Sequence, residues 1–148
     1  MKILCAWLGT ADTDASTSRD GQDVGPIAHV LGERTFDRLV LLADQPKEKV
    51  DRYVEWLGGK TDCEIDLEKV KLSGPTNFGE IYAAATTALD GRLAKQEIKP
   101  ELTFHLSPGT PAMAAVWIIL GKTRYAAELI ESSKQHGVKT ASVPLDIS

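Results

Sequence analysis

A short polar turn between two apolar stretches carries residue types that can bind an anion. Ser107-Pro108-Gly109-Thr110 follows an apolar strand pattern over residues 102–106 and precedes an apolar helix pattern that begins at Pro111. Thr110 is a favourable N-cap, and proline is tolerated at the first helical position. The first amides of the helix, the positive end of its dipole and the hydroxyl groups of Ser107 and Thr110 together suit a phosphate. An ordinary capped turn has the same composition, so the turn alone leaves both interpretations open.

A second polar stretch, residues 9–23, follows the first predicted strand. It begins with Gly9-Thr10 and is predicted to be a loop, and its length for a strand-to-helix connection favours a functional role. Its carboxylates are Asp12, Asp14, Asp20 and Asp23. Aspartates in such stretches more often cap turns than bind metal, and no second carboxylate or histidine cluster accompanies them. We therefore expect no metal ion here.

The composition fits one globular domain. The chain has 148 residues, of which 43% are hydrophobic, enough to bury roughly two-thirds of the unfolded surface. The net charge of −4 argues against direct binding of duplex DNA but leaves a small anionic ligand possible. Cys5 and Cys63 form neither a disulfide framework nor a metal-ligand spacing, so we expect buried thiols in a reducing compartment. No signal peptide or membrane span is visible, because the apolar run over residues 112–120 is too short, and a cytoplasmic location is the default expectation.

Strand and helix patterns alternate along the chain. Residues 2–8 are almost entirely apolar, as in a strand covered on both faces, whereas residues 63–70 alternate apolar and acidic side chains, as in a half-exposed edge strand. These patterns predict an α/β fold: a Rossmann-like three-layer sandwich with a mostly parallel sheet of order 3-2-1-4 and then an antiparallel C-terminal hairpin. The other predicted strands are 39–42, 102–106, 127–132 and 138–143, and the predicted helices are 26–31 (ended by Gly32), 47–57, 78 to about 91 and 111 to about 122.

In a sheet of this order, the first and fourth strands are neighbours where the strand order reverses. Ligands of such folds bind at that point, beyond the carboxyl ends of the strands. The loops that begin at Gly9 and Ser107 are therefore expected to meet there. A dinucleotide cofactor is not expected, because Gly9-Thr10-Ala11-Asp12 is not a glycine-rich fingerprint and no Walker lysine motif is present.

The helix that begins at Pro111 has no polar face. Residues 112–120 are all apolar, and one sheet cannot cover a helix on every side. In a domain this small a partner subunit is the simplest cover. The sequence therefore predicts a homodimer formed through this helix.

The segment Leu106-Ser107-Pro108-Gly109-Thr110-Pro111-Ala112-Met113, with Gly9-Thr10 and the polar stretch after the first strand, resembles the CRISPR-associated Rossmann fold (CARF) domains. The resemblance covers nearly the whole chain in element order and is specific in the Ser-x-Gly-Thr-Pro-x-Met segment. It implies a dimeric sensor that binds a cyclic oligoadenylate or a related RNA-end ligand across its twofold axis and controls a fused effector. Residues 1–148 would be that sensor domain, without the effector.

A narrower resemblance concerns the output of the sensor. The Asp-rich first loop and the ending Ser142-Val143-Pro144-Leu145-Asp146 resemble the N-terminal sensor domain of RNA-repair operon activators, which are sigma-54 dependent regulators. This resemblance implies control of a transcription activator.

The resemblance and the predicted switch point together give a set of site residues. The amides of Gly109 and Thr110 are expected to hold phosphate, and Thr10 and Ser16 to bond ribose hydroxyls. Two residues at the neighbouring strand end are expected to read a base edge. The predicted ligand-binding set is Gly9, Thr10, Asp12, Asp14, Ser16, Thr76, Asn77, Ser107, Pro108, Gly109, Thr110 and Met113, the base-reading pair being Thr76 and Asn77.

The leading hypothesis is a sensor that performs no chemistry, so no catalytic residue is predicted. The alternative is a metal-independent ring nuclease acting in the same pocket, since cleavage by the ligand's own 2′-hydroxyl needs only positioning and charge stabilisation. Only Arg19 and Lys122 are basic candidates near the motifs, which weakens this alternative. The three histidines lack the arginine spacing of a HEPN-type ribonuclease and are expected to be structural or solvent-facing. A third hypothesis is a dimerisation module with an empty pocket.

Overall fold

The computed structural model describes residues 1–144, which contain one six-stranded sheet. Its order is β3-β2-β1-β4-β5-β6, and every neighbouring pair is parallel except β5 with β6. The predicted α/β fold, the 3-2-1-4 order and the antiparallel hairpin are confirmed. The strands are β1 (Lys2–Trp7), β2 (Arg38–Ala43), β3 (Glu64–Lys69), β4 (Glu101–His105), β5 (Glu128–Ser133) and β6 (Gly137–Thr140).

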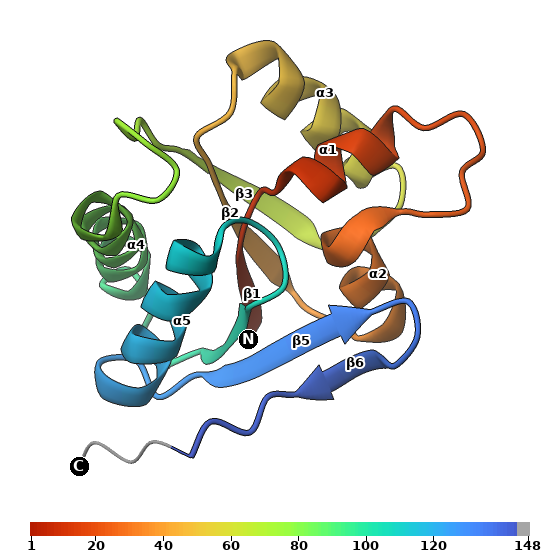
Figure 1. Ribbon diagram of the computed structural model, residues 1–148. Helices are drawn as coiled ribbons and strands as arrows, with labels where there is room; N and C mark the ends of the chain where they lie inside the picture. Colours follow the sequence, from red (N-terminus) through yellow and green to blue (C-terminus); the bar gives the residue numbers. More distant parts are fainter. Residues whose placement is uncertain (145–148) are drawn as a thin grey trace.

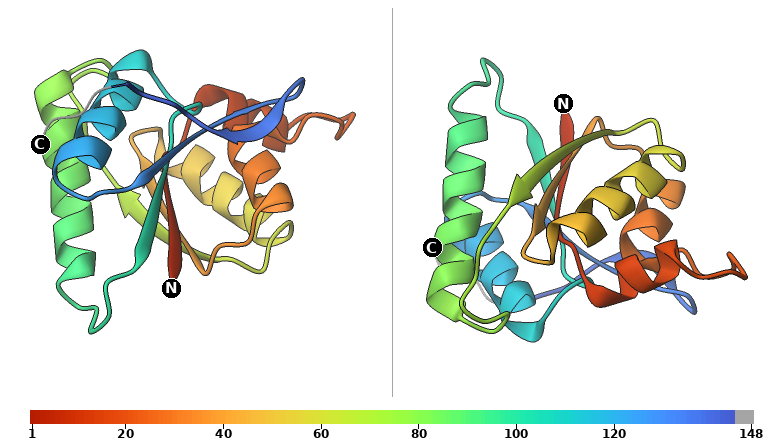
Figure 2. Two further views of the ribbon diagram at one scale, coloured as in Figure 1. Left: turned by 90° about the horizontal axis from the view of Figure 1, so that it is seen from below. Right: turned by 90° about the horizontal axis from the view of Figure 1, so that it is seen from above.

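Helices cover both faces of the sheet, which gives three layers (Figures 1 and 2). Three helices lie on one face and two on the other. The first group is α1 (Thr10–Ser16), α2 (Gly25–Glu33) and α3 (Lys47–Gly58), and the second is α4 (Phe78–Leu93) and α5 (Pro111–Thr123). Within the described part of the chain, no helix has both the length and the apolar character needed to span a membrane.

Strand β1 lies in the interior of the sheet and supplies both cores. Leu4 and Ala6 pack into the core shared with α2 and α3, whereas Cys5 and Trp7 pack into the core shared with α4 and α5. All four side chains are fully buried. Because a strand covered on both faces cannot desolvate polar side chains cheaply, the apolar run predicts this central place.

Residues 10–16 form helix α1, where the sequence predicts a polar loop over 9–23. Serine, threonine and aspartate disfavour helix interiors, which explains the prediction. Asp12 stabilises the helix against this preference, because its Oδ2 accepts a hydrogen bond from Gly9 N at 3.0 Å and closes the first turn. Thr13 N then donates to Gly9 O at 3.3 Å. The loop prediction is therefore wrong for the first half of the stretch.

Helix α2 passes through Gly32, at which the sequence predicts its end. It continues to Glu33, and Arg34 N still donates to Val30 O at 2.9 Å. A glycine inside a helix costs only about 1 kcal/mol. Burial of Ile27 and Val30 in the core outweighs that cost.

The C-terminal hairpin is shorter than predicted. Its register ends at the pair Ile130 and Thr140, whereas the sequence pattern predicts a strand to residue 143. Ala141 N makes one more backbone bond, to Leu129 O at 2.8 Å. The last two residues of the segment that carries the narrower resemblance, Leu145 and Asp146, lie outside the described residues.

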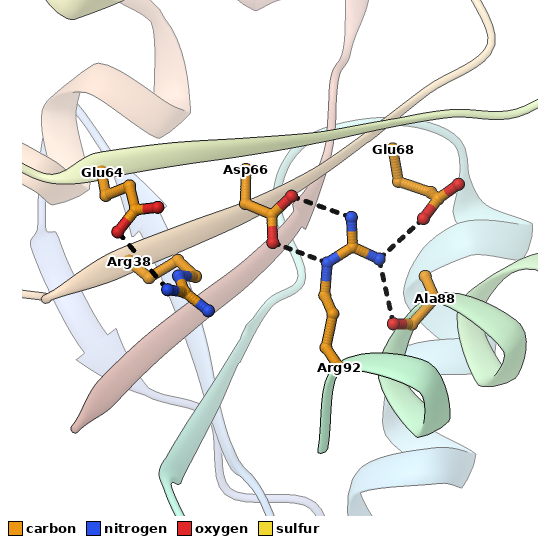
Figure 3. A network of polar contacts seen from close by, with 6 residues as sticks. All are labelled: Arg38, Glu64, Asp66, Glu68, Ala88 and Arg92. Carbon is orange, nitrogen blue, oxygen red and sulfur yellow. Dashed lines mark hydrogen bonds and ion pairs between the residues drawn. The ribbon is translucent and has the colours of Figure 1, made fainter. Parts of the chain in front are cut away.

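Strand β3 forms one edge of the sheet, as its alternating pattern predicts, and α4 covers its acidic face (Figure 3). Arg92 of α4 donates to both oxygens of Asp66, from Nε at 2.7 Å and from Nη2 at 2.9 Å. Its Nη1 reaches Glu68 Oε1 at 2.6 Å and Ala88 O at 3.0 Å. Hydrogen bonds from Arg92 hold the pKa of Asp66 below its ordinary value. One guanidinium therefore anchors the edge strand to the helix layer.

Replacing Arg92 with Ala is expected to lower the free energy of unfolding by about 2 kcal/mol, because two half-buried carboxylates lose their shared donor and repel each other. Denaturant unfolding monitored by circular dichroism measures this. The control is Lys47→Ala, which removes a surface ion pair with Asp51 and should cost less than about 0.5 kcal/mol. Equal losses in the two variants would contradict the anchoring role.

Candidate functional site

A cavity of about 290 Å³ lies at the carboxyl edge of the sheet, where β1, β2 and β4 end. The predicted meeting of two loops is confirmed, because a β-carbon added to Gly9 would lie 2.6 Å from Gly109 N. This is the point at which the strand order reverses. The lining residues are Leu8, Gly9, Thr10, Ala11, Pro26, Asp44, Gln45, Pro75, Ser107, Pro108, Gly109, Thr110 and Met113.

Gly109 has a φ of +88°, in the left-handed region that favours glycine. An added β-carbon would lie 2.6 Å from Met113 Sδ and 3.3 Å from Trp7 Cβ. The turn therefore needs glycine both for its backbone conformation and for its packing. It places the backbone at the N-terminus of α5 against the cavity.

Both hydroxyl groups of the turn are engaged within the protein. Thr110 Oγ1 accepts from Met113 N at 3.3 Å and donates to Pro75 O at 2.8 Å. Ser107 Oγ accepts from Ser132 N at 2.8 Å and lies 3.3 Å from Ser132 O. These hydroxyls cap α5 and join neighbouring segments, which is a difference from the anion-binding role predicted for them.

Backbone amides are the donors that remain. Within residues 1–144, the N–H groups of Gly109 and Ala112 have no hydrogen-bond acceptor. They precede or begin a helix of 13 residues, whose dipole is positive at this end. The turn can therefore hold an anion through its backbone.

Asp12 is fully buried and bonded to the backbone of Gly9, which lines the cavity. Its Oδ2 accepts from Gly9 N and its Oδ1 from Ile27 N, each at 3.0 Å. One carboxylate thus caps both α1 and α2 and fixes the loop that carries Gly9. Burial raises the pKa of Asp12 from 3.8 to about 6, against the two backbone hydrogen bonds that lower it.

This raised pKa predicts a pH dependence of stability. Between 3.8 and about 6 the folded protein retains a proton on Asp12 that the unfolded chain has lost, so the contribution of Asp12 to stability falls as the pH rises through that interval. Asp12→Asn removes the titratable carboxyl group. It also turns the side-chain NH2 group toward one of the two backbone N–H donors. Its destabilisation is expected to be larger at pH 4 than at pH 7, by about 2 to 3 kcal/mol. Urea unfolding of both proteins from pH 4 to pH 8 measures the difference, and a constant difference would contradict the shift.

Five predicted site residues do not line the cavity: the buried Asp12 and four others. Asp14 is exposed on α1, and Ser16 donates to Thr13 O at 2.7 Å. Asn77 is the N-cap of α4, where its Oδ1 accepts from Glu80 N. Thr76 lies beside it and is exposed. The structure brings together the Gly9-Thr10 turn, residues 107–110 and Met113, and Asp12 contacts this group through its hydrogen bond from Gly9 N.

The sequence analysis missed six lining residues: Leu8, Ala11, Pro26, Asp44, Gln45 and Pro75. Asp44 and Gln45 directly follow the buried strand β2, which neighbours β1. Polar residues at the carboxyl end of a strand beside the switch point are the signal that could have found them. Among the residues that the structure describes, Asp44 is also the only charged one that lines this cavity.

His105, the last residue of β4, is fully buried and joins two strands. Its Nε2 lies 2.7 Å from Ser132 Oγ on β5. Burial lowers the pKa of His105 to about 3, so the ring is neutral near pH 7. Among the described residues, no three His, Cys, Asp or Glu side chains are arranged to hold a metal ion.

Comparison with known proteins gives matches among solved structures. No family model and no curated protein matches the sequence. The structure of Enterococcus italicus Csm6 bound to cyclic hexa-2′-fluoro-hexa-dAMP superposes with a TM-score of 0.75 over 96% of this chain, at 20% identity. Can2 from Sulfobacillus thermosulfidooxidans in complex with cyclic tetra-adenylate gives 0.62 over 98%, at 14% identity. This chain shares their fold.

A third structure with this fold is protein VC1899 from Vibrio cholerae, with a TM-score of 0.66 over 94% of this chain at 13% identity. The chain spans only 36% of the Csm6 chain, 33% of VC1899 and 38% of Can2. The similarity therefore concerns one part of each larger protein. Two of the three structures contain, by their names, a cyclic oligoadenylate or its analogue.

Proposed function

We propose that this domain is a CARF-type sensor that binds a cyclic oligoadenylate, or a related RNA-derived ligand, in the cavity at the switch point. The observation that carries the proposal is that the amides of Gly109 and Ala112, at the N-terminus of α5, have no acceptor within residues 1–144. Gly109 lines the cavity, and the fold is shared with Csm6 and Can2, whose structures hold such rings. A phosphate of the ligand would accept from these amides.

The size of the cavity supports a dimer. Its volume of about 290 Å³ is just below the range for small-molecule pockets, roughly 300 to 1,000 Å³. It has room for one part of an oligonucleotide ring and not for the whole ring. In the proposed assembly, two copies related by a twofold axis each hold part of one ring.

Helix α5 is the proposed dimer contact. Val116, Trp117 and Leu120 point into the core, while an opposite apolar surface is only half-buried. We call this the α5 surface; it consists of Ala114, Ala115, Ile118 and Ile119. Nothing within residues 1–144 covers it fully, and a second copy would do so.

A ring nuclease in the same cavity has less support. Cleavage of a phosphodiester needs a group that stabilises charge developing on the phosphate. No lysine, arginine or histidine lines the cavity within the described residues, and its one charged residue is the acidic Asp44. We therefore assign no catalytic residue.

Control of an effector is the proposed output. The chain corresponds to about a third of each structural neighbour, so the other parts of such proteins would receive the signal. The regulator of RNA repair and transcription implied by the narrower sequence resemblance stays a prediction, since the neighbours give it no support.

One experiment tests the sensor against its alternatives. The purified protein is mixed with cyclic tetra-adenylate, cyclic hexa-adenylate and linear oligoadenylates, binding is measured by calorimetry, and products are separated by chromatography. Binding of at least one ring, with the ring recovered intact, is expected. Linear products would instead establish the nuclease, and failure of every ligand to bind would overturn both proposals.

A further inference from the structure

The cavity is polarised, with donors on one side and acceptors on another. The donor side is the N-terminus of α5, where Gly109 lines the cavity and its amide has no acceptor within residues 1–144. The acceptor side lies at the end of β2, where Asp44 and Gln45 line the cavity. Gln45 donates from Nε2 to Leu8 O at 3.2 Å, which leaves its Oε1 as the group available to a ligand.

Asp44 has an unengaged carboxylate. It is half-buried, and within residues 1–144 it takes part in no side-chain hydrogen bond or ion pair, although most other half-buried acidic residues of this chain are paired. An ionised carboxylate accepts hydrogen bonds and donates none. It repels a phosphate, so the part of a ligand that contacts Asp44 must be neutral and must carry a donor.

A ribonucleotide fits this polarity through its sugar. Its phosphate accepts at the α5 end, and its 2′-hydroxyl can donate to a carboxylate. The same kind of contact occurs in dinucleotide-binding folds, where an acidic residue about 20 residues beyond the first glycine turn binds a ribose hydroxyl. Here Asp44 follows β2, the strand that pairs with β1.

We propose that Asp44 reads the 2′-hydroxyl of the bound nucleotide and so makes the cavity selective for ribose rings. This inference rests on the proposed sensor function and deepens it by naming the residue that sets sugar specificity. Gln45 lies beside Asp44, where Oε1 offers a second, uncharged acceptor to the same nucleotide.

The test compares two ligands that differ only in that donor. Cyclic adenylate rings of four and six nucleotides are titrated beside their 2′-fluoro analogues, because fluorine keeps a ribose-like sugar pucker but cannot donate a hydrogen bond. The wild-type protein is expected to bind the ribose ring at least about tenfold more tightly, the effect of one hydrogen bond to a charged group. In Asp44→Ala this preference is expected to disappear.

Two further variants complete the test. Asp44→Asn keeps an oxygen acceptor and is expected to retain part of the preference. Asp62→Asn changes the net charge equally at an exposed position outside the cavity and should bind both rings as the wild type does. If the wild type binds both rings equally, or if Asp44→Ala weakens both by the same factor, Asp44 does not read the sugar. If no ribose ring binds the wild type, the sensor proposal itself fails.

Discussion

Gly109→Ala is expected to weaken ring binding by at least about tenfold and to lower the free energy of unfolding by about 1 to 3 kcal/mol. The positive φ of Gly109 disfavours any β-carbon. That carbon would also meet Met113 Sδ and Trp7 Cβ, at 2.6 and 3.3 Å. The turn must shift, and the amides of Gly109 and Ala112 then lose the alignment that suits a phosphate. Calorimetry with the cyclic adenylates and denaturant unfolding measure the two effects separately.

Two control variants distinguish an effect on the ligand site from an effect of backbone strain. Gly21 also has a positive φ, of +65°, but it lies in open space outside the cavity. Gly21→Ala should therefore lose stability and keep its affinity. Gly91→Ala lies inside α4 with nothing near its added β-carbon, and should gain about 0.5 to 1 kcal/mol with unchanged binding. Unchanged ring affinity in Gly109→Ala would place the ligand elsewhere.

The sheet could be predicted from local sequence because the burial of each strand determines the pattern of apolar and polar residues within that strand. Residues 2–8 are apolar because β1 has helices on both faces. The alternation of apolar and acidic residues in β3 is typical of a strand at the edge of the sheet. Chain connectivity and the right-handed crossover then leave few possible orders, which is why 3-2-1-4 could be predicted. The two loops meet as a consequence of that order.

The roles of single side chains could not be predicted in the same way, because their partners are distant in sequence. Asp12 accepts from Gly9 N in the first turn of α1, a helix that propensity alone disfavours, and also from Ile27 N of α2, 15 residues away. Thr110 donates to Pro75 O, 35 residues away. A hydroxyl or carboxylate can serve a ligand or the protein's own backbone, and only the fold decides between them. The lining role of Asp44 depends likewise on where β2 ends.

Ile119→Glu is expected to convert the proposed dimer to a monomer at micromolar concentration and to weaken ring binding by about 100-fold. Ile119 lies on the α5 surface and belongs to neither core cluster, so the fold of the monomer should tolerate the change. In a twofold interface the substitution occurs twice, and two carboxylates would be buried without partners, at a cost of several kcal/mol. Sedimentation velocity measures the assembly, and calorimetry measures the affinity.

The control for Ile119→Glu is Ile98→Glu, which makes the same chemical change at a side chain that is 83% exposed in the connector before β4. It should leave both mass and affinity unchanged. If the Ile119→Glu protein is still a dimer, the interface does not lie on α5. A monomeric variant with full ring affinity would show instead that one cavity suffices for the ligand, which would contradict the shared site. Because each copy of the proposed dimer would contribute one small cavity, ring affinity and dimer affinity are expected to fall together across a series of substitutions on the α5 surface.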